Sequence, residues 1–467
     1  MNIMARSREA GASTTGAPAP GRGFWQAQPA VMAGGVLKPA LFLAGLCVLI
    51  RLSVWFVYRP IIFDDTSTYD LMARQIFNLD FSQYLGQRTP VYPLFLLLSG
   101  LNPYVTWLYQ SLLGVGVSLL LFHIAWRITG HIRLAFLAGL SYSLCINQVF
   151  FEAGLLTESL STFLLVLALD VFVLADESRS RRLILHGCLG VVVSLAALTR
   201  PLLLFLIPLY LFFLLLVGVE RRLETGLLLR GVLAFLLPIV LLVGGWSLFN
   251  KSTTGYFGPT TLVGYNLTQH SGAFMELAPD RYADVRDVYL QFRAKRIAEA
   301  GTHSMTIWRA TPAMLASTGL SYGELSRRLR DVSVYLFLHH PIRYGENVYT
   351  AWRRFWVVEN YWQLDKLRVQ ALRSPLELAW KMERLLLVAV NWAYLVLGLL
   401  SILVPRLRIS MTRIEWLLLA TVLSGSVLQA MTEFGENSRY AIPFQVLVLF
   451  GLILRVQPVL AVAAGKS

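Results

Sequence analysis

Two adjacent carboxylates, Asp64 and Asp65, are the first residues of this sequence that suggest chemistry. They follow directly after the first long apolar stretch, which ends near position 57. Neighbouring like charges raise a pKa or require a cation, so the pair suits a general base or a metal site. The structural alternative is that Asp65 caps the next helix, whose Tyr69 and Met72 begin an apolar stripe. Capping needs one oxygen acceptor and does not explain two carboxylates, but both interpretations stay open at this point.

Three arginines also lie at the ends of apolar stretches. Arg88 precedes a short apolar run at 94–100, Arg200 forms the turn between two long stretches, and Arg439 precedes the last one. A guanidinium group forms two-point, charge-assisted hydrogen bonds to phosphate, so each could be a phosphate clamp. For Arg88, contact with a lipid headgroup is an equally good explanation.

Two further titratable residues complete the candidates. Glu158 lies at the end of an apolar stretch, where a carboxylate at membrane depth is costly and needs a partner. His270 lies in a long polar segment and could ligate a metal, although a lone histidine carries little weight.

Motifs for nucleotide chemistry are missing from the sequence. The last residues, Ala-Gly465-Lys466-Ser467, resemble the end of a P-loop, but Leu460 stands where the first glycine is required. Neither an HExxH nor a GxSxG motif occurs. An enzyme with this sequence must therefore use an activated donor other than a nucleotide held in a phosphate-binding loop.

Composition indicates which kind of protein positions these residues. Of 467 residues, 56% are hydrophobic and 15% charged, and the mean hydropathy is +0.59. Apolar runs of about 20 residues match the thickness of a bilayer core. The sequence therefore predicts an all-α polytopic membrane protein. Its net charge of +14 comes from basic residues between the apolar runs, which indicates membrane topology and no nucleic-acid partner.

Apolar runs predict about ten transmembrane helices. They lie at about 37–57, 104–127, 132–150, 154–174, 183–199, 201–218, 228–249, 384–404, 413–431 and 440–457. We expect a flexible cytoplasmic tail at 1–36, a seven-helix catalytic module at 37–249 that includes an outer loop at 58–103, and an extracytoplasmic loop domain at 250–380. Three C-terminal transmembrane helices at 381–458 and a cytoplasmic tail at 459–467 follow.

The arginines of the short loops predict the orientation. They are concentrated in alternate loops, near positions 127–133, 179–182, 221–230 and 406–413. The positive-inside rule places those loops and both termini in the cytoplasm. Asp64, Asp65, Arg88, Glu158, Arg200 and Arg439 then all face the outer side. The topology therefore predicts acids and arginines around one outer-leaflet pocket.

The two long outer segments contain helical patterns of their own. Loop 58–103 is expected to hold two surface helices. In 250–380, capping boxes at Ser321–Glu324 and Ser374–Glu377 mark helix starts. Six aromatic residues at near-helical spacing favour an aromatic belt at the membrane interface. They are Tyr349, Trp352, Phe355, Trp356, Tyr361 and Trp362.

Five of these motifs together resemble the GT-C superfamily of membrane glycosyltransferases, within the bacterial group that is similar to protein O-mannosyltransferases and the lipid A aminoarabinose transferase. The matching segments are Asp64-Asp65 with Tyr69, Arg88-Thr-Pro-Val-Tyr-Pro93, Thr157-Glu158, Thr199-Arg200-Pro201 and Arg439-Tyr-Ala-Ile-Pro443. The family's seven-helix core, with a catalytic first outer loop, would correspond to about 37–249.

The resemblance implies a function and roles for residues. Members transfer a sugar from a polyprenyl-phosphate donor to an extracytoplasmic acceptor, usually with inversion, in the bacterial inner membrane. Asp65, or else Asp64, would be the base, and Arg88, Arg200 and Arg439 would contact the donor phosphate, with Tyr69 and Glu158 in support. Some members need a divalent metal ion, for which Asp65, Glu158 and His270 are weak candidates. The sugar and the acceptor (lipid A, glycan, lipid or protein) stay open.

Two other classes of protein compete with this interpretation. A polysaccharide polymerase or ligase with lipid-diphosphate donors also has many spans and a basic outer loop, but does not need paired acids after the first span. A flippase or transporter of lipid-linked sugars would show inverted repeats and charges near mid-membrane, which this sequence lacks.

Overall fold

The computed structural model describes residues 33–463 and is all-α within that range, apart from one isolated bridge between Ile61 and Gly154. This confirms the predicted fold class for the described part of the chain. Residues 1–32 of the predicted N-terminal tail lie outside the description, and helix α1 already begins at Ala33. The predicted C-terminal tail overlaps α21, which extends to Ala463.

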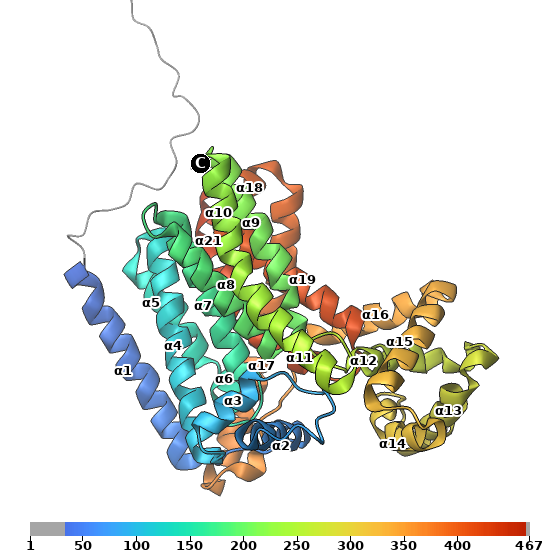
Figure 1. Ribbon diagram of the computed structural model, residues 1–467. Helices are drawn as coiled ribbons and strands as arrows, with labels where there is room; N and C mark the ends of the chain where they lie inside the picture. Colours follow the sequence, from blue (N-terminus) through green and yellow to red (C-terminus); the bar gives the residue numbers. More distant parts are fainter. Residues whose placement is uncertain (1–32, 464–467) are drawn as a thin grey trace, which may run out of the picture.

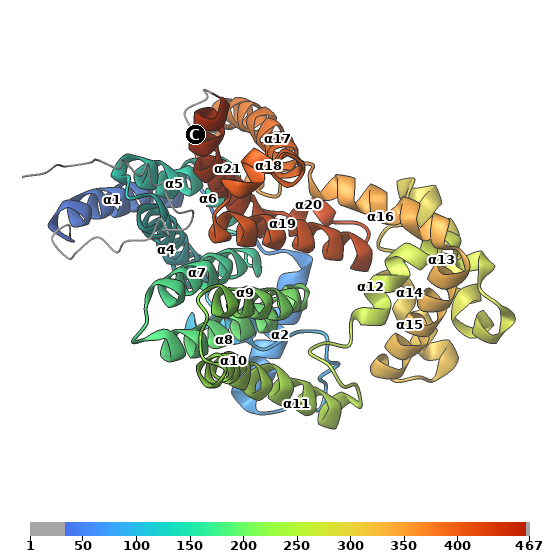
Figure 2. The same ribbon diagram turned by 90° about the horizontal axis from the view of Figure 1, so that it is seen from above.

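Long apolar helices form a bundle with α7 near its centre (Figures 1 and 2). The bundle consists of α1 (Ala33–Val57), α4 (Pro103–Thr129), α5 (Ile132–Leu144), α6 (Ile146–Phe151), α7 (Glu158–Glu177), α8 (Arg182–Thr199), α9 (Leu206–Glu220), α10 (Thr225–Ile239), α11 (Gly245–Thr254), α17 (Arg373–Leu403), α18 (Pro405–Ile409), α19 (Arg413–Thr432), α20 (Asn437–Tyr440) and α21 (Ile442–Ala463). Most of α7 is buried, as expected for a helix that is apolar all round.

Within residues 33–463, eight helical segments are long and apolar enough to cross a membrane. The two other predicted spans correspond to shorter apolar helices, Ile132–Leu144 and Ile442–Val456. By length and composition the chain is thus a multi-pass membrane protein, while the count of ten spans stays a prediction. The short helix η2 (Pro201–Phe205) leads directly into α9. The short helix η3 (Val240–Gly244) joins α10 to α11 and begins two residues after Pro238.

The span predicted at 132–150 is interrupted at Cys145, where the backbone is extended. The cause lies in α17, because the Glu383 carboxylate accepts hydrogen bonds from the backbone N–H groups of Ile146 and Asn147, at 2.7 and 3.1 Å. A carboxylate there satisfies the free N–H groups of a new helix start. Helix α6 therefore begins as a separate element.

Two short helices, α2 (Asp64–Asn78) and α3 (Val91–Leu98), lie together at one end of the bundle (Figure 1). We call this the α2 end, and the opposite end, where α18 lies, the α18 end. Both helices fall in the segment 58–103, for which two helices were expected. Their position on the outer membrane surface stays a prediction.

A side lobe of helices projects from the bundle near the α2 end (Figures 1 and 2). It consists of α12 (Val263–Ser271), α13 (Ala283–Ala300), α14 (Thr306–Thr318), α15 (Tyr322–His339) and α16 (Pro341–Phe355), with short 3-10 turns at Gly272–Leu277 and Asp280–Tyr282. The lobe has an apolar core of its own around Tyr265, Tyr289 and Leu329. The capping box at Ser321–Glu324 starts α15 as predicted.

Candidate active site

Asp65 lies in the first turn of α2, and this turn is tied to the segment just before α7. The backbone N–H of Ile61 donates to the carbonyl of Ala153 at 2.8 Å, and the N–H of Leu155 donates to the carbonyl of Ile61 at 3.0 Å. The Thr66 hydroxyl donates to the carbonyl of Leu155 at 2.9 Å. This strap holds the start of α2 against the start of α7, which carries Glu158.

The carboxylate of Asp65 lies between two arginines from distant parts of the chain. Its Oδ1 accepts from Nη2 of Arg88 at 2.6 Å and its Oδ2 from Nη2 of Arg439 at 2.9 Å. Asp65 does not cap α2, because the helix begins at Asp64 and the capping position belongs to Phe63. The capping interpretation of Asp65 is therefore wrong.

Arg88 is oriented by further contacts with α2. Its Nε donates to the Thr68 hydroxyl at 2.8 Å and its Nη1 to the Tyr69 hydroxyl at 3.2 Å. The guanidinium carbon also lies 4.3 Å from the centre of the Tyr69 ring. Tyr69 thus supports Arg88 by a hydrogen bond and a cation–π contact.

The loop that carries Arg88 is anchored by the segment leading into the side lobe. The Thr260 hydroxyl lies 3.1 Å from the carbonyl oxygen of Gly86 and 3.0 Å from that of Gln87. The backbone N–H of Thr261 donates to the carbonyl of Gly86 at 2.8 Å. Residues 260 and 261 therefore help to set the position of Arg88.

Arg439 lies in α20 and contacts three carboxylates. Besides Asp65, its Nη1 is 2.7 Å from Oε2 of Glu436, and its Nε is 3.4 Å from Oε1 of Glu158. The same Glu158 oxygen is 3.2 Å from Nη1 of Arg200, at the end of α8. Asp65, Arg88, Glu158, Arg200 and Arg439 thus form one connected group, which we call the Asp65 cluster.

Several polar atoms of the Asp65 cluster are left without hydrogen-bond partners. Among the described residues, Oε2 of Glu158, Nη1 of Arg200 and Nε of Arg439 are buried and accept or donate no hydrogen bond. Glu158 is 1% exposed. Buried polar groups without partners are costly, so the cluster has capacity to bind a further polar group.

Electrostatics keep Asp65 ionised in this arrangement. Burial on its own would raise the pKa of the carboxyl group, but the guanidinium groups of Arg88 and Arg439 outweigh it and hold the pKa below its usual value. A carboxylate paired in this way is a weak proton acceptor until its arginines are engaged elsewhere.

Two glutamates next to the Asp65 cluster were missed in the sequence. Burial raises the pKa of Glu433 and of Glu436, and the positive charge of Arg439 opposes the rise in both. A signal was available, since both precede Arg439 at the same end of an apolar stretch.

Asp64 and His270 are not part of the cluster. Asp64 is exposed. Its backbone carbonyl accepts from the Ser67 hydroxyl at 2.8 Å, but its carboxylate has no hydrogen-bond partner among the described residues. His270 is fully buried between the side lobe and the end of α19, packed against Tyr344 and Phe434, and burial lowers its pKa to about 4.

The weak metal candidates do not form a metal site. Asp65 and Glu158 both have Arg439 as a counterion, and His270 contacts neither. Within residues 33–463, no group of three or more His, Cys, Asp or Glu side chains is arranged to hold an ion. Among the described residues, Asp65, Glu158 and His270 therefore do not come together in such a group.

Comparisons with known proteins return little. No protein-family model matches the chain, and no curated protein does. Among solved structures, the chain is similar to the crystal structure of ArnT from Cupriavidus metallidurans bound to undecaprenyl phosphate. The identity is 14% and the TM-score 0.38, over 92% of this chain and 80% of that chain. At this identity and score, we base the functional proposal on the residues of the chain itself.

Proposed function

We propose that the protein is a membrane glycosyltransferase that moves a sugar from a polyprenyl-phosphate donor to an acceptor hydroxyl. The observation that carries the proposal is the Asp65 cluster, which joins the carboxylates of Asp65 and Glu158 to arginines from three parts of the chain at one end of an apolar bundle. Cluster and bundle together suit a substrate with an anionic headgroup and a hydrocarbon tail.

In this proposal, Arg88, Arg200 and Arg439 bind the donor phosphate. When the bond between the sugar and the phosphate oxygen breaks, negative charge grows on that oxygen. Guanidinium groups already in place and partly buried stabilise this charge more strongly than water does. The nitrogens of Arg200 and Arg439 that form no hydrogen bond among the described residues support this role, because phosphate oxygens would compete only with their ion-pair contacts to Glu158.

Asp65 then removes the proton of the acceptor hydroxyl. The acceptor oxygen attacks the anomeric carbon, its proton passes to the Asp65 carboxylate, and the electron pair of the breaking bond stays on the phosphate. One such displacement inverts the anomeric centre. We favour Asp65 over Asp64 as the base, because Asp64 is exposed and has no arginine beside it.

The ion pairs of Asp65 link donor binding to this step. Without donor, the carboxylate occupies Arg88 and Arg439 at 2.6 and 2.9 Å. An arriving phosphate competes for the same guanidinium groups. The guanidinium groups then lower the pKa of Asp65 less than before, and burial raises it. Asp65 therefore becomes a better proton acceptor once the donor is bound.

The proposed location is a bacterial inner membrane, with both termini in the cytoplasm and the α2 end outside. The positive loops support it, since they lie at the α18 end, where Arg221 follows the last turn of α9 and Arg413 begins α19. Outside the cytoplasm, a lipid-linked donor supplies the energy of transfer without a nucleotide.

A transfer assay with the purified full-length protein tests the proposal. The donors are a polyprenyl-monophosphate sugar, the matching diphosphate and the nucleotide sugar, and the acceptor is an envelope extract from cells that lack the protein. We expect mass spectrometry to find the sugar on an envelope component only with the monophosphate, and only when Asp65 is intact. Asp70→Asn is the matched control, because Asp70 lies on the same helix and pairs only with the exposed Arg74.

Two outcomes would replace the proposal with its competitors. Transfer from the diphosphate alone would indicate a polymerase or ligase. Movement of the lipid-linked sugar across a vesicle membrane without transfer would indicate a flippase.

A further inference from the structure

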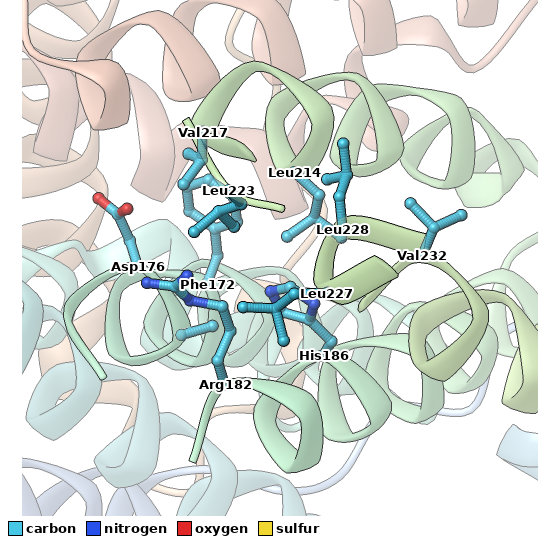
Figure 3. A pocket seen from close by; sticks show the side chains of 11 residues that line it. Phe172, Asp176, Arg182, His186, Leu214, Val217, Leu223, Leu227, Leu228 and Val232 are labelled. Atoms are coloured by element: carbon cyan, nitrogen blue, oxygen red, sulfur yellow. The ribbon is translucent and has the colours of Figure 1, made fainter. Parts of the chain in front are cut away.

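A cavity lies at the α18 end, far from the Asp65 cluster. Its enclosed part holds only about 20 Å³ and opens to a wider mouth between α7, α8, α9 and α10. Arg182 and His186 extend into it from α8, and Leu214, Leu227 and Leu228 form part of the opposite wall (Figure 3). The 20-residue helix α7 separates it from Glu158 by about 30 Å, so it is a separate site.

Arg182, which lines this cavity, forms no ion pair within residues 33–463. Arg182 is 6% exposed, and its Nε has no hydrogen-bond partner among the described residues. The carboxylate that lines the cavity, Asp176, is taken by other arginines: Nη2 of Arg221 at 2.5 Å and Nη1 of Arg413 at 2.9 Å. A guanidinium nitrogen buried without a partner is unfavourable, so an anion bound beside it would be stabilising.

The start of α8 favours an anion at the same place. The helix begins at Arg182, and the capping residue Arg181 offers no side-chain acceptor to its first N–H groups. No acidic residue lies in the first turn. Free N–H groups and the positive end of the helix dipole attract negative charge, as a phosphate supplies.

Apart from Arg182, Asp176 and His186, the cavity is lined by apolar side chains, and it continues onto an exposed apolar helix face. Leu227, Leu229 and Leu233 of α10 are 38%, 56% and 56% exposed. A free anion would leave these side chains uncovered, whereas a lipid would place its alkyl chains along them.

We propose that this cavity binds the phosphate headgroup of an anionic membrane lipid, with Arg182 and the start of α8 as the anion site and α10 as the surface for its chains. The lipid occupies the leaflet at the α18 end, which is the cytoplasmic one in our orientation. The site neutralises the buried charge of Arg182 and so stabilises the packing of α8 against α10. It does not depend on the proposed transferase activity.

The test measures the melting temperature of the full-length protein, purified in a neutral detergent, with three additives. They are phosphatidylglycerol, diacylglycerol with the same chains, and inorganic phosphate. Phosphatidylglycerol is expected to raise the melting temperature, and the other two to leave it unchanged. In Arg182→Gln, the lipid concentration for half of the effect should rise roughly 10- to 100-fold, since a charge-assisted hydrogen bond is lost. Arg230→Gln, which removes an exposed arginine of α10, should respond like the unmodified protein.

A second variant tests the same site with Arg182 in place, in case Arg182→Gln does not fold. Leu227→Trp fills the cavity without removing charge and should also lose the lipid effect. Native mass spectrometry should then find fewer retained phosphatidylglycerol molecules than in the unmodified protein. Equal lipid responses in all variants would overturn the site, and an equal response to inorganic phosphate would overturn the lipid assignment.

Discussion

Two buried ion-pair groups near the α2 end differ in how completely they are satisfied. In the first, Nε and Nη2 of Arg51 donate to Glu152 at 2.9 and 2.6 Å, and Nη1 donates to the Ser143 hydroxyl at 2.9 Å. The Tyr142 hydroxyl donates to the same carboxylate at 3.1 Å. In the Asp65 cluster, by contrast, buried atoms of Glu158, Arg200 and Arg439 lack partners.

This difference separates a structural role from a binding role. A fully satisfied network inside a bundle joins helices and has nothing left to offer a ligand. A partly satisfied one lowers stability unless something else completes it. We therefore expect the Arg51 pair to matter for folding and the Asp65 cluster to matter for substrate.

The largest effect is expected for Asp65→Asn. Asparagine keeps the size of the side chain but cannot take up a proton, so transfer should fall by about 10²–10⁴-fold. Donor KM should not rise, because the carboxylate that competes for Arg88 and Arg439 has been neutralised. Steady-state kinetics on a variant with an unchanged melting temperature check both statements. A fully active Asp65→Asn protein would disprove the assignment of the base.

Breaking the Arg51 pair should instead reduce stability. Glu152→Ala leaves a buried guanidinium group unpaired and should cost about 3–5 kcal/mol of unfolding free energy. Replacing Arg51 and Glu152 together with methionine should cost less than either single change, because no charge is left behind. Denaturation in detergent measures this, with Glu377→Gln in an exposed pair as the control. A double variant less stable than Glu152→Ala would contradict a purely structural role.

Arg439→Ala should weaken use of the donor by roughly 10- to 140-fold, which corresponds to about 1.5–3 kcal/mol for a charge-assisted hydrogen bond. Arg439→Lys should recover only part of the loss, since an ammonium group cannot form the planar two-point contact. Arg74→Ala, an exposed arginine of α2, serves as control. Unchanged donor kinetics in folded Arg439→Ala would remove the clamp from the mechanism.

The smallest effect concerns pH. In the free protein the pKa of Asp65 is held below its usual value, so its ion pairs persist on mild acidification and are lost only as the pH falls through that lowered pKa. In the donor complex the arginines contact phosphate and the pKa rises. The acid limb of kcat should therefore lie at higher pH than the acid limb of kcat/KM. Coincident limbs would show that donor binding leaves Asp65 paired.

Much of the arrangement of the candidate site could be predicted from the sequence. Apolar run lengths located the long helices, and the alternation of basic loops placed Asp65, Arg88, Glu158, Arg200 and Arg439 at one end of the bundle. The structure brings these five side chains into contact. Their catalytic roles stay predictions.

Other features depended on contacts that no local pattern contains. A Cβ atom at Gly114 would clash with Oε1 of Glu152, so this glycine makes room for the buried ion pair. The capping box at Ser374–Glu377 was wrong, because α17 already begins at Arg373. In the predicted aromatic belt, Phe355, Trp356 and Trp362 are buried inside the protein.

The sequence by itself determined which segments are helical and apolar, and which charged residues lie at helix ends, because hydrophobicity and charge act locally along the chain. Only the tertiary structure decided the pairings: Arg51 with Glu152, Asp65 with both Arg88 and Arg439, and Glu383 with the start of α6. Partners of this kind come from elements far apart in the chain. They are selected by the cost of burying a charge without a counterion, which arises only after the helices have packed.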